Sequence, residues 1–223
     1  MKKLLWIISF IASGALYYAS IKHVIGLDPT EVIGFITGGY CVWLTVVQNI
    51  WNWPIGILNA VAFAALFLHS KLYADAGLQV IYVILGFIGW YWWLRGGDHK
   101  SKLKVGHISL LEAGILTGLG ILATIGFTRF LMHIGDVAPL WDGLTTISSL
   151  IAQYMLTKKY FENWAVWIAT DVIYIVLYGY KHLFLTGILY FIFLVMCIVG
   201  VRKWRQTAPV EIDHNVNIEG REA

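Results

Sequence analysis

The stretch NWAVWIATDVIYIVLYGY, residues 163–180, decides the fold class because it combines the length of a membrane helix with an apolar composition. A helix that crosses the hydrocarbon core of a bilayer needs about 20 predominantly apolar residues. Asp171 is the only charged residue in the stretch. An ionised carboxylate at that depth costs roughly 2.5–3.5 kcal/mol on the insertion scale, so Asp171 is expected to face a cavity or a partner.

The rest of the chain has the same character. It has 223 residues, of which 59% are hydrophobic and 13% charged, and its mean hydropathy is +0.71. That balance is typical of an integral membrane protein. Short clusters of charge separate eight apolar runs, which we expect to be eight transmembrane helices in an all-α fold: 4–21, 31–50, 53–69, 75–94, 107–130, 143–157, 163–180 and 183–201.

The first run could be a signal peptide, but no small-residue cleavage site clearly follows it before Lys22, so we expect a retained helix. Cys41 and Cys197 both lie inside predicted spans and are expected to be packing residues rather than a disulfide. The histidines include no pair at metal-ligand spacing on one helix, and no phosphate-binding loop is recognisable. The sequence therefore predicts no metal and no cofactor, and it gives no support for an enzyme.

Basic residues are distributed unevenly between the two sides of the predicted bundle. With the N-terminus placed inside, eleven flank the cytoplasmic ends (Lys2, Lys3, Arg95, Lys100, Lys102, Lys104, Lys158, Lys159, Arg202, Lys203 and Arg205) and four flank the other ends (Lys22, Lys71, Arg129 and Lys181). This bias predicts that both termini are cytoplasmic. The pI near 8.8 therefore reflects topology, and no nucleic-acid partner is expected.

An internal repeat appears when the chain is shifted by 111 residues. Asn52-Trp53 then aligns with Asn163-Trp164, and the agreement continues through two further spans. Other aligned pairs are Leu78 with Leu189, Ile81 with Ile192, Gly89 with Gly200 and Trp93 with Trp204. Each unit has three helices, and one helix lies between the units, so both units are expected to have the same orientation in the membrane.

The predicted organisation follows from this repeat. It comprises an N-terminal transmembrane helix and loop (1–30), a first three-helix repeat (31–95), a basic cytoplasmic loop and linker helix (96–141), a second three-helix repeat (142–205) and a disordered cytoplasmic tail (206–223). Membrane repeats of this kind usually build transporters that hold a substrate between their halves near the bilayer midplane. A non-transport membrane scaffold is the alternative, although it has little reason to keep polar groups in its spans.

Aromatic and acidic side chains form one stripe along 163–180. Trp164, Trp167, Asp171, Tyr174 and Tyr178 recur at helical spacing, whereas the matching positions of the first repeat hold Trp, Gly, Ala, Phe and Phe. The faces of Trp and Tyr rings attract cations by about 0.5–2 kcal/mol each. A flat, cationic heteroaromatic ligand would satisfy the stripe, although packing or an interfacial aromatic belt would also explain it.

The polar residue Glu112 needs no such ligand. It lies nearer a span end, where snorkelling or a local pair explains a carboxylate.

Five motifs resemble those of the PnuC-type vitamin transporters: WPIGILN (53–59), LYADAGLQ (72–79), GWYWW (89–93), ENWAVWIATDV (162–172) and YKHLFLTGILY (180–190). The likeness extends in the same order from about 31 to 205. It implies a core of 3+1+3 helices related to the SWEET sugar carriers, with an added N-terminal helix. It also implies a place in the inner membrane of a bacterium and is compatible with a homotrimer.

The resemblance further implies a function. Members of this family carry a B-vitamin precursor by facilitated diffusion, typically nicotinamide riboside, which a cytoplasmic kinase then traps by phosphorylation; related subgroups carry thiamine or riboflavin. Nicotinamide riboside and thiamine are cationic, so Asp171 favours these two over neutral riboflavin. The likeness places ligand contacts at Trp53, Asn59, Gln79, Trp164, Trp167, Asp171 and Tyr190, to which the stripe adds Tyr174.

One departure from the family pattern bears on the choice of vitamin. Nicotinamide riboside members commonly carry Asn three residues before Gly-Trp-Tyr, and this chain has Gly86 there.

Overall fold

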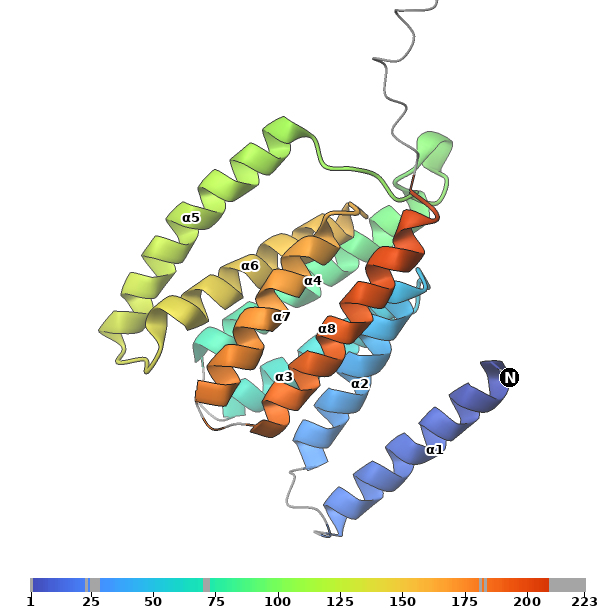
Figure 1. Ribbon diagram of the computed structural model, residues 1–223, viewed down its shortest axis with the longest axis vertical. Helices are drawn as coiled ribbons and strands as arrows, with labels where there is room; N and C mark the ends of the chain where they lie inside the picture. Colours follow the sequence, from blue (N-terminus) through green and yellow to red (C-terminus); the bar gives the residue numbers. More distant parts are fainter. Residues whose placement is uncertain are drawn as a thin grey trace, which may run out of the picture.

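The computed structural model describes residues 2–22, 24, 29–69, 73–180, 182 and 184–208. These residues form eight α-helices, a short 3₁₀ helix (η1, Asp98–Lys100) and no named β-strand, which confirms the all-α prediction. The helices are α1 (Lys2–Ile21), α2 (Pro29–Val46), α3 (Asn52–His69), α4 (Tyr73–Arg95), α5 (Leu110–His133), α6 (Pro139–Thr157), α7 (Asn163–Tyr180) and α8 (Phe184–Arg205). Figure 1 shows them as a bundle with α1 and α5 at its two flanks. The predicted tail, from residue 209 onward, lies outside the described residues.

Two helices begin three or more residues from their predicted starts, whereas the others begin within two residues of them. α5 begins at Leu110 rather than at 107, because the Ser109 side chain caps the helix by accepting the backbone N–H of Glu112 at 3.2 Å. α6 begins at Pro139, four residues before the predicted start at 143. Proline suits the first position of a helix because its fixed φ is helical and the missing N–H would have no intrahelical partner.

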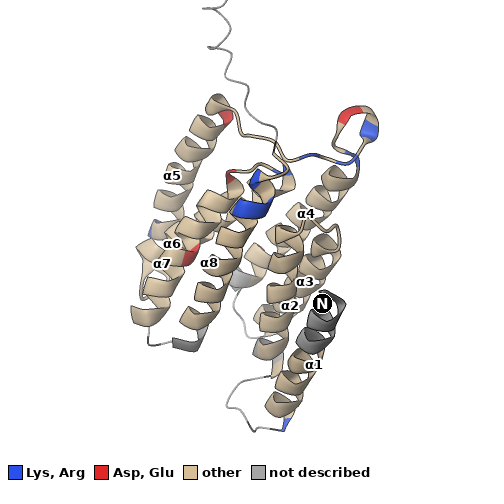
Figure 2. Ribbon diagram, turned by 45° about the vertical axis from the view of Figure 1, so that its right-hand side comes forward, with Lys and Arg blue, Asp and Glu red and all other residues tan. Residues whose placement is uncertain are grey.

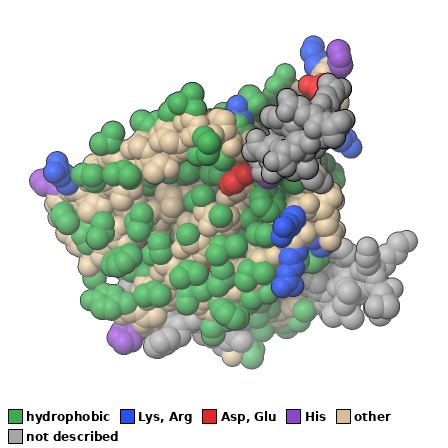
Figure 3. Space-filling view, turned by 45° about the horizontal axis from the view of Figure 1, so that its top comes forward, with side chains coloured by type: hydrophobic (Ala, Val, Ile, Leu, Met, Phe, Trp, Pro, Cys, Tyr) green, Lys and Arg blue, Asp and Glu red, His purple; other side chains and the backbone are tan. Residues whose placement is uncertain are grey.

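The outer surface of the bundle is suited to lipid. Within the described ranges, four helical segments are long and apolar enough to cross a membrane: 52–69, 76–95, 110–133 and 187–205. Large apolar side chains are exposed on most helices, for example Leu122 on α5 and Val176 on α7. Figure 3 shows hydrophobic side chains spread across one face of the molecule. An exposed apolar surface of this extent is expected of a protein embedded in a bilayer.

The helices pack in two corresponding sets. α3 packs against α2 and α4, and α7 packs against α6 and α8. The two sets meet where α2 contacts α8 and where α4 contacts α6. On the outside, α1 lies on α2 and α5 lies on α6. Under the 111-residue shift, α2, α3 and α4 correspond to α6, α7 and α8, so each of these contacts has a counterpart in the other set.

α2 and α6 also end in the same way. Gln48 and Lys159, which are 111 residues apart, adopt left-handed φ values of 54° and 56°. The backbone N–H of Gln48 bonds the carbonyl of Thr45 at 2.9 Å, and that of Lys159 bonds the carbonyl of Leu156 at 2.9 Å. This turn ends α2 at Val46 rather than at the predicted 50. Glycine usually occupies this position, so two larger residues at equivalent positions indicate that the fold requires the turn.

Positive charge is concentrated at one end of the bundle. Figure 2 shows Lys and Arg where α4 ends, where α6 meets α7 and where α8 ends. We call this the basic end and define it as residues 95–109, 158–162 and 202–208. The first turns of α3 and α7 lie at the same end, because each follows the C-terminus of the preceding helix directly.

Candidate functional site

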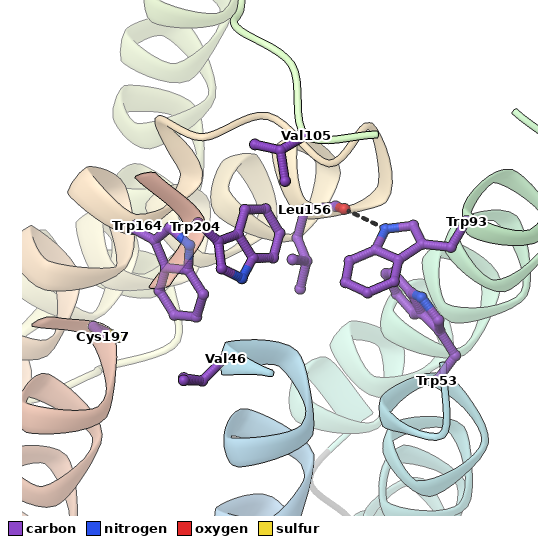
Figure 4. Packing of buried hydrophobic residues seen from close by; sticks show 8 residues of the cluster. All are labelled: Val46, Trp53, Trp93, Val105, Leu156, Trp164, Cys197 and Trp204. Atoms are coloured by element: carbon purple, nitrogen blue, oxygen red, sulfur yellow. Dashed lines mark hydrogen bonds between the residues drawn. The ribbon is translucent and has the colours of Figure 1, made fainter. Parts of the chain in front are cut away.

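Four tryptophans at the basic end pack together across both sets of helices, and we call them the tryptophan layer: Trp53, Trp93, Trp164 and Trp204 (Figure 4). Trp53 meets Trp93 edge to face, with ring centroids 5.4 Å apart and planes at 86°. Trp164 meets Trp204 in the same arrangement, at 5.3 Å and 89°. The rings of Trp93 and Trp204 lie 5.9 Å apart, so the layer is continuous between the two sets.

Glycine makes this packing possible. A side-chain carbon at Gly89 would overlap the ring of Trp53, and one at Gly200 would overlap the ring of Trp164. Both glycines lie four residues before the second tryptophan of their pair. The aligned Gly and Trp of the sequence repeat are therefore explained by packing between neighbouring helices.

Some buried polar atoms in and beside this layer have no hydrogen-bond partner in the part of the chain that the structure describes. The side chains of Trp53 and Trp164 are only 3% and 2% exposed, yet neither indole N–H has a hydrogen-bond partner among the described residues. The side-chain oxygens of the preceding residues, Asn52 and Asn163, are also buried without a hydrogen-bond partner among the described residues. Buried polar groups in folded proteins nearly always have a partner, often ordered water. These equivalent atoms can therefore receive a ligand or water.

Asp171 lies midway along α7, eight residues and about 12 Å from its start. Its side chain is 3% exposed and is directed at α8, where the Cys197 thiol donates to its Oδ2 at 3.4 Å. The carboxylate thus faces a partner, as the sequence predicts. The equivalent positions of the first set hold Ala60 and Gly86, so the two sets differ chemically at this level.

Three tyrosines stack beyond Asp171, toward the end of the bundle opposite the basic end. Tyr174 and Tyr190 have ring centroids 4.3 Å apart with planes at 28°, and Tyr178 and Tyr190 lie 5.3 Å apart at 14°. The structure therefore brings the predicted residues Tyr174 and Tyr190 together. In the first set Phe63 and Phe67 stack in the positions equivalent to Tyr174 and Tyr178, without hydroxyl groups.

Asn59 lies at the interface of α2 and α3, where its Nδ2 donates to the Thr37 hydroxyl at 2.5 Å. Thr170 and Ser148 occupy the equivalent positions in the other set. The Thr170 hydroxyl donates to the Ser148 hydroxyl at 2.9 Å. Asn59 is therefore oriented by α2.

The other predicted contacts lie elsewhere. Gln79 is half-buried on α4, at the position equivalent to Tyr190. Trp167 is half-buried and packs against the tryptophan layer. The predicted site residues thus fall into separate groups: Trp53, Trp164 and Trp167 at the basic end, Asp171, Tyr174 and Tyr190 along α7 and α8, Asn59 with α2, and Gln79 on α4. Their role in binding stays a prediction.

Sequence reasoning missed Cys197 as a polar partner, because a lone cysteine in an apolar span indicates packing. The signal that could have found it is the repeat, which pairs Cys197 with Gly86 as it pairs Asp171 with Ala60. For Glu112, the sequence analysis offered a local pair as one explanation. Its carboxylate accepts hydrogen bonds from the hydroxyls of Tyr154 at 2.9 Å and Tyr160 at 2.8 Å. Burial and this bond raise the pKa of Tyr160 to about 12.

No group of three His, Cys, Asp or Glu residues within the described ranges could hold a metal ion.

The segment 101–109 crosses over the tryptophan layer, and we call it the strap. Its Val105 is buried against the layer, and its Gly106 exchanges backbone hydrogen bonds with Lys159 at 3.2 Å and Phe161 at 2.8 Å. The Lys159 ammonium donates to the carbonyl of Leu103 at 2.9 Å and lies 4.5 Å from the ring centroid of Trp93. Burial, with a smaller contribution from the charge of Lys102, lowers the pKa of Lys159 to about 8.

An apolar exterior, a carboxylate held between helices and corresponding three-helix sets define a multi-pass α-helical membrane protein with a polar interior. Comparison with known proteins identifies the family. The chain belongs to the nicotinamide mononucleotide transporter family, which matches residues 28–206 and consists of membrane transporters.

Individual relatives show the breadth of this family. The chain is 26% identical to the nicotinamide riboside transporter PnuC of Escherichia coli (strain K12), over 82% of this chain and 87% of the relative. It is 24% identical to the riboflavin/roseoflavin transporter RibM of Streptomyces davaonensis, over 85% and 91% of the two chains. The crystal structure of the vitamin B3 transporter PnuC shares its fold, with a TM-score of 0.67, 21% identity and coverage of 93% and 92%.

Proposed function

We propose that this protein carries nicotinamide riboside across the bacterial inner membrane by facilitated diffusion. The observation that supports this most directly is the Asp171 carboxylate, buried midway along a membrane helix beside stacked tyrosines. Nicotinamide riboside has a flat, positively charged ring, which a carboxylate attracts and aromatic faces can stack against. The relative from Escherichia coli, which is named for transport of this nucleoside, adds independent support.

Thiamine is the second candidate because it is also cationic and aromatic. Gly86 keeps this candidate open, since the position departs from the asparagine expected of nicotinamide riboside carriers. Riboflavin is a weaker candidate: RibM supports it as a relative, but riboflavin is neutral and gives the Asp171 charge no role.

We also propose that α2–α4 and α6–α8 are parallel repeats in a SWEET-like 3+1+3 arrangement, with α5 as the linker and α1 as the added helix. Corresponding tryptophan pairs and helix ends support this arrangement. The basic end would face the cytoplasm, in agreement with the distribution of Lys and Arg, and both termini would then be cytoplasmic.

Transport in this proposal proceeds by rocking of the two repeats about a site between them. The ring would stack on Trp164, Trp167 and the tyrosines, the substrate hydroxyls would bond Asn59 and Gln79, and Asp171 would offset the charge. The indole N–H groups of Trp53 and Trp164, which have no partner among the described residues, would donate to oxygens of the substrate. Phosphorylation in the cytoplasm would trap the product, so no coupled ion is required.

Uptake of labelled nicotinamide riboside into vesicles that contain the purified protein tests this proposal. Facilitated diffusion predicts saturable uptake that stops when the inside and outside concentrations are equal, whether or not a proton gradient is imposed. Accumulation that depends on the gradient would contradict facilitated diffusion, and the absence of saturable uptake would contradict transport of this substrate.

A further inference from the structure

Two reciprocal hydrogen bonds join the halves of the bundle at the basic end. The indole N–H of Trp93 on α4 donates to the carbonyl of Leu156 on α6 at 3.0 Å. The indole N–H of Trp204 on α8 donates to the carbonyl of Thr45 on α2 at 3.1 Å. Each donor and each acceptor is shifted by 111 residues from its counterpart, so the second bond repeats the first in the opposite direction. Figure 4 shows the first of these bonds beside the packed rings.

These bonds close the space between the two sets of helices. Trp93 and Trp204 are almost fully buried, and Val46 and Leu156 lie in the same apolar cluster. Val105 of the strap packs against the layer. Lys159 connects the strap to the layer, because its ammonium donates to the carbonyl of Leu103 and lies over the ring of Trp93. Buried Trp93 and Trp204 would therefore separate a substrate beside Asp171 from the solvent at the basic end.

We propose that Trp93 and Trp204 act together as the gate of the substrate path at the basic end, an inference that rests on the proposed transport. Both bonds cross between the two sets of helices, one between α4 and α6 and one between α8 and α2. A rocking motion that separates the sets at this end must break both bonds. Closure restores both, because the equivalent contacts form together.

Both acceptor carbonyls take part in a second hydrogen bond, so each indole bond can break and re-form. The carbonyls of Thr45 and Leu156 also accept backbone N–H groups from Gln48 and Lys159. A carbonyl oxygen has two lone pairs, so each acceptor keeps one partner when its indole bond opens. Opening therefore leaves no acceptor wholly unpaired.

Native Cys197 provides a reporter for this gate, because it is buried beside Asp171 and belongs to the apolar cluster below the tryptophans. In a Cys41→Ala background, it is the single remaining thiol of the chain. Sealed vesicles of known orientation are treated from each side with a cationic, membrane-impermeant methanethiosulfonate reagent, without substrate. The variants are Trp93→Phe, Trp204→Phe and the double variant, which keep an aromatic ring but lose the N–H. Trp51→Phe at the same end is the control, since its side chain is 62% exposed.

The double variant should react about tenfold faster than the parent from the basic side, and each single variant about threefold faster, given what one hydrogen bond contributes. Reactivity from the opposite side and in Trp51→Phe should not change. An unchanged rate from the basic side in the double and single variants would overturn the gate, as would an equal increase from both sides. If nicotinamide riboside fails to bind while these rates change as stated, the proposed substrate fails and the gate stands.

Discussion

Trp93 on α4 donates its indole N–H to the carbonyl of Leu156 on α6, and this bond connects the two halves of the protein. Its counterpart from Trp204 makes the framework at the basic end nearly symmetric. The symmetry is lost midway along the helices, where Asp171 and Cys197 occupy the positions that Ala60 and Gly86 hold in the first set. We therefore locate recognition of the substrate's charge in the asymmetric middle, and closure by Trp93 and Trp204 in the symmetric tryptophan layer.

Replacing Asp171 with Asn should weaken binding of cationic vitamins about tenfold or more, because a lost charge interaction of roughly 1.4 kcal/mol changes affinity tenfold. Isothermal titration calorimetry with nicotinamide riboside and thiamine measures this change. Glu112→Gln is the matched control, since that carboxylate is held by Tyr154 and Tyr160 near the start of α5. A larger loss in Glu112→Gln than in Asp171→Asn would contradict the site assignment.

Trp53→Phe and Trp164→Phe should reduce substrate affinity while lowering thermal stability less than Trp93→Phe does. The lost N–H has no partner among the described residues, so the fold loses no hydrogen bond, whereas a ligand loses one worth about 0.5–1.5 kcal/mol. Calorimetry and thermal unfolding of the same samples separate the two effects. Trp93→Phe, which does lose a protein bond, serves as the comparison and should melt at a lower temperature. Unchanged affinity in both Trp53→Phe and Trp164→Phe would remove these indoles from the site.

Gly86→Ala should destabilise the protein by roughly 1–3 kcal/mol, because a side-chain carbon there would lie 2.6 Å from Cγ1 of Ile57. In an Ile57→Ala background, Gly86→Ala should cost less stability, measured against Ile57→Ala alone, than it costs in the parent. Gly77→Ala on the same helix is the control, since nothing lies within 4 Å of its added carbon. Thermal unfolding in detergent measures all four proteins. Equal effects at Gly86 and Gly77 would show that α3 and α4 can separate freely.

Lys159 predicts a specific pH dependence of stability. Its pKa is about 8 in the folded protein, mainly through burial, and about 10.4 in an unfolded chain. Between these values the unfolded state binds more protons, so the free energy of unfolding contributed by this residue rises with pH from about 8 to about 10. Below pH 8 the buried ammonium destabilises the folded state in full.

The substitution Lys159→Gln isolates that effect, because Gln48 is the equivalent residue in the first repeat and tolerates the same left-handed turn. Melting temperatures of the parent and variant are compared from pH 7 to pH 10, where all other groups titrate equally in both. The parent should gain stability relative to the variant above pH 8. Parallel curves would show that Lys159 does not titrate in this range.

The sequence allowed prediction of the elements with strong local signals. Eight apolar runs became eight helices, and four helical segments within the described ranges are long and apolar enough to cross a membrane. The 111-residue repeat predicted equivalent positions correctly for Trp53 with Trp164 and for Gly89 with Gly200, since each Gly permits the tryptophan contact.

Other features depend on contacts between distant residues. The reciprocal bonds from Trp93 and Trp204 use backbone carbonyls, which leave no trace in the sequence. The strap over the layer could not be foreseen either, because Val105 and Gly106 read as part of a basic loop. Spacing along α7 placed Trp164 and Asp171 on one stripe, but only packing shows that they have different partners.

Binding of a ligand panel to the purified protein tests the central claim most directly. The panel comprises nicotinamide riboside, thiamine, riboflavin and a neutral sugar, measured by calorimetry at one pH. We expect saturable binding of nicotinamide riboside, weaker binding of thiamine and none of the sugar, with the Asp171→Asn variant binding the two cationic ligands about tenfold or more weakly. Binding of riboflavin alone, or of none of the four, would contradict the account.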